Sequence, residues 1–245
     1  MRGEFLMSTF KRTFRTLASA AVGMAITAAV AFDAHAEMAQ TDVALVQQMG
    51  EASNNKKLHA LELYYDLHVS ELTVQSMSER RTGAMFAVQR AKAANKAPSV
   101  VAELEQKAQQ VNAERAEKVK DNQNLRVKLG EISGLDFSDP LVMVPDAPLD
   151  MPMASSSVPA DLAAAQKQAW AALIAAQNAW QQERLTLLDA QQRYDDTRDV
   201  PIGDHLRAMT KAETTYAQAI GACRLIEAKI AVATGKPLLE VLSAL

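Results

Sequence analysis

The sequence predicts an all-α protein, in which two long antiparallel helical hairpins form a coiled-coil-like four-helix array with an internal two-fold repeat and no β-barrel. Five of the eight prolines lie within residues 140–159, and long proline-free segments flank this window. Because proline costs about 3 kcal/mol inside a helix, these segments can form long helices. Apolar and alanine side chains recur in them at steps of three and four, the spacing of a coiled coil. No segment after residue 36 alternates apolar and polar residues as a half-buried strand does.

Residues 1–36 have the pattern of a cleaved export signal. Basic residues precede an apolar stretch, and small residues follow it: Lys11, Arg12 and Arg15, then residues 17–32, then Ala34 and Ala36. The apolar stretch is shorter than the roughly 20 residues that a membrane-spanning helix needs. We therefore expect cleavage near Ala36 and a mature chain without a membrane span. Such a chain would lie in the periplasm, either free or held at the outer membrane by a partner.

Six segments follow from the positions of proline, glycine and the apolar periodicity. Residues 37–54, after the signal, are polar and short, so we expect a flexible N-terminal segment. The remaining boundaries are a first hairpin repeat at 55–133 with helices at 55–94 and 99–132, a Pro-rich linker at 134–157, a second hairpin repeat at 158–236 with helices at 159–196 and 201–233, and a C-terminal tail at 237–245.

Local signals support the ends of these helices. Pro98 and Pro201 break the helices before them, since the residue that precedes proline disfavours helical geometry. Ser157 can cap the first turn of the third helix. Gly134 and Gly235 suit helix ends, because glycine readily adopts the left-handed conformation there.

Three of the predicted helices carry a stripe at the 3,4 spacing. The stripe of the second helix is interrupted by three polar residues, Arg115, Lys118 and Asn122. These side chains could face a solute-filled lumen, or they could set the register of the hairpin. The stripes are Val101, Leu104, Ala108, Val111, Arg115, Lys118, Asn122, Leu125, Leu129 and Ile132; Leu162, Ala165, Ala169, Leu173, Ala176, Trp180, Glu183, Leu187, Ala190 and Tyr194; and Leu206, Met209, Ala212, Tyr216, Ile220, Cys223, Glu227, Ile230 and Ala233.

The residues do not form a catalytic or metal-binding pattern. His59 and His68 are nine residues apart, which places them on opposite sides of a helix. Cys223 falls on an apolar stripe and reads as a core residue. Linker methionines, Met143, Met151 and Met153, lack a nearby cysteine or histidine. We expect no cofactor and no enzymatic activity, and the net charge of −3 argues against nucleic acid as a partner.

The two halves of the chain repeat, and they resemble a known family. Gln89-Arg90 and Gln192-Arg193 precede Pro98 and Pro201 at the same spacing. Several further segments follow one another in a characteristic order and spacing: Ala60 to Leu67, Leu125 to Leu129 with Gly134-Leu135, Pro140 to Pro152, Arg193-Tyr194, Val200 to Leu206, and Ala217 to Gly235. In this order and spacing, residues 57–238 resemble TolC-type outer membrane efflux proteins.

This resemblance implies a homo-oligomer, a trimer, whose hairpins build a periplasmic tunnel and whose helix turns dock on an adaptor protein of an efflux pump. Such proteins carry membrane strands of about 9–11 alternating residues, for which this chain has no room, so it would be a reduced relative. The alternative is a free-standing periplasmic coiled-coil binding protein, chaperone-like or metal-buffering, without a transport role. On the analogy, the partner-contacting tip residues are Asn95, Lys96, Ala97, Pro98, Ser99, Arg198, Asp199, Val200, Pro201 and Ile202.

Overall fold

The computed structural model describes residues 41–141, 157–197 and 202–243, and every regular element in these ranges is an α-helix. The chain divides into two units, Met1–Ala39 and Gln40–Leu245, and the described residues belong to the second. The expected signal peptide and most of the linker lie outside the described residues. The helices are α2 (Asp42–Gln48), α3 (Asn54–Ala93), α4 (Pro98–Ser133), α5 (Ala160–Thr197), α6 (Ile202–Thr234) and α7 (Leu238–Ser243).

The four long helices confirm the predicted all-α fold, and their ends fall within one residue of the predicted ends. Ser53 caps α3 by accepting a hydrogen bond from the Lys56 amide. Pro98 is the first residue of α4, where its missing amide proton costs nothing. Gly134 ends α4 with a φ of 77°. The proline and glycine signals therefore act at the helix ends.

Each long hairpin is antiparallel, because residue numbers rise along one helix as they fall along its neighbour. In the first hairpin, Lys92 of α3 pairs with Glu105 of α4 close to the turn. Farther from the turn, the Asn122 side-chain amide of α4 donates to Ser70 Oγ of α3 at 3.2 Å. In the second hairpin, Trp180 stacks on Tyr216 at 5.5 Å between ring centroids, and Trp170 donates to Glu227 farther along.

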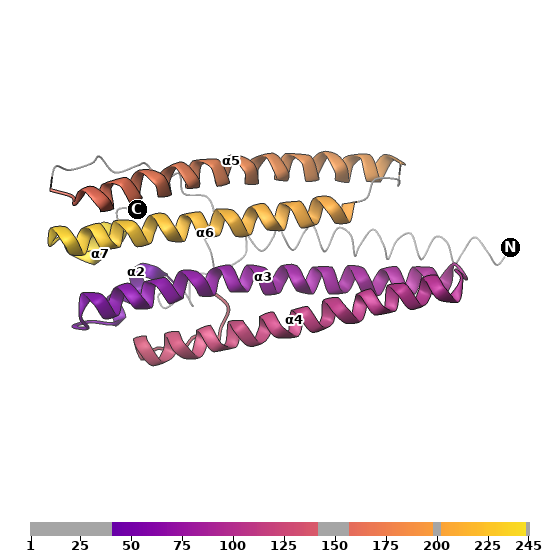
Figure 1. Ribbon diagram of the computed structural model, residues 1–245, viewed down its shortest axis with the longest axis horizontal. Coiled ribbons are helices and arrows are strands. Elements are labelled where there is room, and N and C mark those ends of the chain that lie inside the picture. Colours follow the sequence, from indigo (N-terminus) through magenta and orange to yellow (C-terminus); the bar gives the residue numbers. More distant parts are fainter. Residues whose placement is uncertain (1–40, 142–156, 198–201, 244–245) are drawn as a thin grey trace. The chain divides into compact units, whose positions relative to one another are not determined.

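The two hairpins meet through α3 and α6, which gives the order α5, α6, α3, α4 (Figure 1). Gly221 of α6 lies against the ring of Tyr65 of α3. Nearer the turns, Arg80 of α3 and Arg207 of α6 line the same groove. Helices α3 and α6 are thus the inner pair, while α4 and α5 are the outer helices.

Two hydrophobic clusters hold this unit together. The base cluster lies where α2, α7, the first half of α3 and the ends of α4 and α6 meet, and it centres on Leu45, Leu61, Leu67 and Leu129. The second cluster lies between α5 and α6. Its buried members are Trp170, Leu173, Ala176, Trp180, Tyr216, Ala219 and Cys223.

The expectation of a flexible segment at residues 37–54 is wrong for the part that the structure describes. Thr41 caps α2 by accepting a hydrogen bond from the Ala44 amide, and Leu45 and Val46 are fully buried in the base cluster. The tail at 237–245 likewise contains α7, which buries Leu238 and Leu242 there. Segments of six or seven residues are too short to show helical periodicity, so only the tertiary contacts reveal them.

A buried carboxylate joins α2 to both inner helices. Asp42 Oδ2 accepts hydrogen bonds from the Tyr65 hydroxyl of α3 at 2.7 Å and from Arg224 of α6 at 2.8 Å. Burial, together with the nearby Asp42 carboxylate, raises the pKa of the Tyr65 hydroxyl well above its ordinary value. These contacts fix the first helix of the unit across the joint between the hairpins.

Candidate interaction surfaces

The turn of the first hairpin is a compact, exposed tip formed by Asn95, Lys96 and Ala97. Asn95 has a φ of 48°, the left-handed region that asparagine tolerates better than most residues. The Asn95 amide donates to the Lys92 carbonyl at 3.1 Å, and the Lys96 amide donates to the Ala91 carbonyl at 3.0 Å. These two hydrogen bonds satisfy carbonyl groups at the end of α3, and Asn95 occupies the left-handed position that glycine commonly takes there.

The predicted tip residues around this turn lie together on the surface. All five of them are exposed: Asn95, Lys96, Ala97, Pro98 and Ser99. Lys96 has no ion-pair partner among the described residues, so its charge is available at the turn.

Most of the second predicted tip lies outside the described residues. Arg198, Asp199, Val200 and Pro201 belong to this part, and Ile202 is described only as the first residue of α6. The structure therefore describes the first predicted tip in full and only Ile202 of the second.

The three polar seam residues of α4 divide into two groups. Arg115 Nε donates to Ser78 Oγ of α3 at 2.8 Å, and Asn122 is buried and donates to Ser70 Oγ. Lys118 instead is exposed and pairs with Asp121 on its own helix at 3.2 Å. Arg115 and Asn122 thus make contacts inside the hairpin that favour the register role over the lumen role.

Each outer helix carries a second stripe at the 3,4 spacing, and every residue of it is exposed. We call these two sets the outer stripes. Each contains one charged residue, so they are unusually free of charge for exposed helix faces. The α4 stripe consists of Ala102, Gln106, Gln109, Ala113, Ala116, Lys120, Gln123 and Val127; the α5 stripe consists of Ala164, Gln168, Ala171, Ala175, Asn178, Gln182, Leu185, Asp189 and Gln192.

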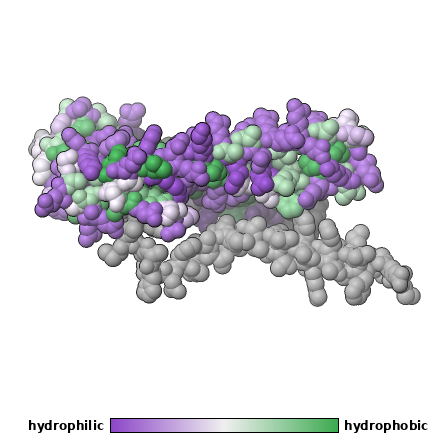
Figure 2. Space-filling model, turned by 90° about the horizontal axis from the view of Figure 1, so that it is seen from below, coloured by the Kyte–Doolittle hydropathy of each residue, from purple (hydrophilic) through white to green (hydrophobic). Residues whose placement is uncertain are grey.

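Large apolar side chains stand exposed in or beside these stripes. Val127 of α4 is 61% exposed, and Ile174 and Leu185 of α5 are 55% and 68% exposed. Figure 2, which views the unit from the side of α4, shows hydrophobic residues as separate patches on a mostly hydrophilic surface. The sequence contains this second stripe too, but the other stripe of each helix is more apolar and is the stronger signal.

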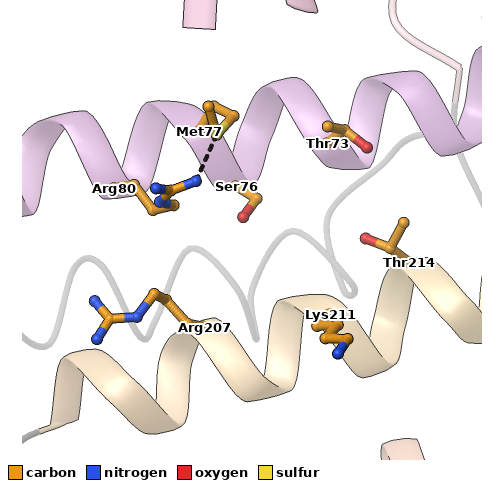
Figure 3. A pocket seen from close by; sticks show the side chains of 7 residues that line it. All are labelled: Thr73, Ser76, Met77, Arg80, Arg207, Lys211 and Thr214. Atoms are coloured by element: carbon orange, nitrogen blue, oxygen red, sulfur yellow. Dashed lines mark hydrogen bonds between the residues drawn. The ribbon is translucent and has the colours of Figure 1, made fainter. Parts of the chain in front are cut away.

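A groove of about 260 Å³ lies between α3 and α6, on the tip side of the joint. Six of its seven lining residues are polar or basic, although the surface that they present to the groove is mainly apolar, and they come from both hairpins (Figure 3). No residue of this groove was singled out from the sequence. The lining residues are Thr73, Ser76, Met77, Arg80, Arg207, Lys211 and Thr214.

The described residues contain no group of three or more histidine, cysteine, aspartate or glutamate side chains that could hold a metal ion. No helix in the described ranges is long and apolar enough to cross a membrane. Cys223 is buried between α5 and α6, and burial with the nearby Glu227 raises the pKa of its thiol to about 12. The linker methionines lie outside the described residues.

Comparisons of this chain with protein-family models, with curated proteins and with solved structures found no match. The resemblance to TolC-type proteins therefore depends on the sequence segments named above.

Proposed function

We propose that this chain is a non-enzymatic helical component of export across the cell envelope, which acts by packing its helices against like subunits or an adaptor protein. In this proposal it corresponds to the periplasmic tunnel part of a TolC-type efflux protein without the membrane strands. The order α5, α6, α3, α4 supports the proposal, because it leaves one outer helix at each edge of the unit.

The observation that carries the proposal is the pair of outer stripes. Helices bury apolar stripes by packing them on a partner, and alanine at successive stripe positions lets two backbones approach closely. An α4 stripe of one copy can pack on the α5 stripe of the next copy, since both are rich in alanine and glutamine. Such a head-to-tail contact joins unlike surfaces, and it forms a ring when the rotation between successive copies closes.

Self-assembly is tested with the purified, processed protein by size-exclusion chromatography with light scattering. We expect a trimer, and we expect Ala113→Glu or Ala175→Glu to yield monomers, because a buried, unpaired carboxylate opposes the contact. Gln110→Glu is the matched control, since Gln110 is exposed on α4 outside the stripe. A monomeric wild-type protein at tens of micromolar would contradict this part of the proposal.

Docking of an adaptor is tested at the tips. Charge reversal by Lys96→Glu and Arg198→Glu should weaken co-purification with an adaptor and pump without changing the circular dichroism spectrum. Arg90→Glu is the control, because Arg90 is exposed on α3 before the turn. Unaltered capture by the tip variants would remove the tips from the proposed contact.

One observation favours the alternative of a free-standing chaperone-like protein. Met85 and Phe86 of α3 are 46% and 51% exposed near the tip, and flexible apolar side chains suit the binding of unfolded clients. This function predicts a stable monomer or dimer that slows the aggregation of a model client. It also predicts that Phe86→Ser weakens this effect, whereas a protein that forms trimers with no effect on aggregation argues against it.

A further inference from the structure

The groove between α3 and α6 places three basic side chains around one space. Arg80 comes from α3, and Arg207 and Lys211 come from α6. Figure 3 shows Arg80 on the side of α3 that faces α6, with Arg207 across from it. Like charges on facing helices oppose their packing, so this part of the joint gains stability if an anion lies between them.

The ion pairs that these basic side chains form are weak. Arg80 pairs with Glu114 of α4 at 3.6 Å, and both side chains are more than a third exposed. Arg207 pairs with Asp204 on the same helix, and that pair is more than half exposed. Exposed pairs of this kind contribute about 0–1 kcal/mol. Lys211 has no ion-pair partner in the described ranges.

Donor groups remain available for a ligand. Arg80 directs one nitrogen at Met77 Sδ, at 3.0 Å, and a second at Glu114, which leaves part of its five N–H donors unused. The Ser76 hydroxyl has no hydrogen-bond partner among the described residues, whereas Thr214 donates to the Thr210 carbonyl. Two guanidinium groups and a serine hydroxyl form a donor set for oxygen ligands.

Acidic side chains also lie at this joint, but they do not line the groove. Glu79 of α3 and Glu213 of α6 lie near one another, and burial together with the Glu79 charge raises the pKa of Glu213. This second pair of like charges weakens the joint further. An anion that bridges the two arginines would offset the repulsion between the arginines only.

We propose that this groove binds a small multivalent oxyanion, which bridges Arg80 and Arg207 and clamps the two hairpins together near their tips. A volume of about 260 Å³ is slightly below that of pockets for drug-sized ligands, so the ligand is a small ion or molecule. A phosphate group and a dicarboxylate share the required chemistry, because each presents several oxygens to two guanidinium forks. None of its lining residues belongs to the predicted tips or to the outer stripes.

The test is isothermal titration calorimetry of the purified protein with inorganic phosphate and, separately, with succinate, at constant ionic strength set by chloride. We expect saturable binding of at least one of them, and the stronger of the two identifies the source. Arg80→Gln and Arg207→Gln should each weaken binding about tenfold or more. The absence of saturable heat with both anions overturns the proposal.

Arg81→Gln is the matched control, because it removes the same charge from an exposed neighbour of Arg80 that does not line the groove. It should leave the affinity unchanged, and an equal loss would mean non-specific attraction and reject the site. Glu114→Gln separates binding from hairpin packing. It frees Arg80, so the affinity should stay equal or rise, whereas a loss would show that Arg80→Gln acts by loosening α3 from α4.

Discussion

The base and the tip of the first hairpin are built from the same two helices, yet they differ in what holds them. At the base, Leu61, Leu67 and Leu129 are completely buried among residues of α2, α6 and α7. Toward the tip, from Arg80 to Val100, Ala91 is the one buried side chain, and Met85 and Phe86 are about half exposed. Polar and charged contacts such as Lys92 with Glu105 join the helices there.

The base therefore stabilises the hairpin, whereas the tip is available for contacts with a partner. Apolar burial contributes roughly 25 cal/mol per Å² and is concentrated at the base, while exposed ion pairs at the tip contribute little. Within the first hairpin, the base therefore contributes more to the folding free energy than the tip does, and the tip can change its contacts at lower cost. A surface with few buried contacts opens locally at low cost, which suits a segment that docks on a partner.

The largest expected effect tests the base directly. Leu61→Ala should lower the free energy of unfolding by about 2–5 kcal/mol, because it removes a completely buried side chain and leaves a cavity. Val100→Ala near the tip should change it by less than about 0.5 kcal/mol. Urea denaturation followed by circular dichroism measures both, and equal effects would contradict the division between base and tip.

The base should also be sensitive to acid through His68. Burial lowers the pKa of His68 from 6.5 to about 4, so between these values the unfolded chain binds a proton that the folded chain does not. Stability is therefore lost as the pH falls from 6.5 toward 4, by up to about 3 kcal/mol.

Urea denaturation at pH 7.5 and pH 4.5 measures this loss. His68→Phe preserves a ring against Tyr64 and should lose less stability than the wild type over this range. His59→Phe, at an exposed position, should behave like the wild type. An unchanged pH dependence in His68→Phe would exclude His68 as the cause.

Two glycine substitutions test how closely α3 and α6 pack at the joint between the hairpins. An added Cβ at Gly221 would lie 2.8 Å from Tyr65 Cβ, so Gly221→Ala should destabilise the protein by about 1–3 kcal/mol. Gly83 has open space around it on α3, so Gly83→Ala should stabilise by about 0.5–1 kcal/mol. Thermal unfolding compares the two, and a neutral Gly221→Ala would show that α3 and α6 pack less closely there.

The smallest effect concerns the turn itself. Asn95→Gly should alter stability by only a few tenths of a kcal/mol, because glycine accepts a φ of 48° without strain. Asn95→Val should cost about 1–2 kcal/mol, since a side chain branched at Cβ strongly disfavours this conformation. Equal thermal unfolding midpoints of the two variants would show that the rest of the turn does not hold residue 95 in the left-handed conformation.

The sequence alone was sufficient for the four long helices. Pro98 sets the start of α4 through its missing amide proton, and Gly134 sets its end through its backbone freedom; these are local effects that need no partner. The stripe through Trp180 was predicted correctly for the same reason, since helical geometry alone places residues three and four apart on one face.

Tertiary structure alone decided which faces meet. α2 and α7 are too short for periodicity to be visible. Their positions are fixed by the burial of Leu45 and Leu242 in the base cluster. Arg80 and Arg207 lie far apart in the chain, so no spacing rule relates them, and only the packing of α3 on α6 brings them to one groove. Local geometry acts within a few residues, whereas contacts between distant segments depend on the shapes of whole faces.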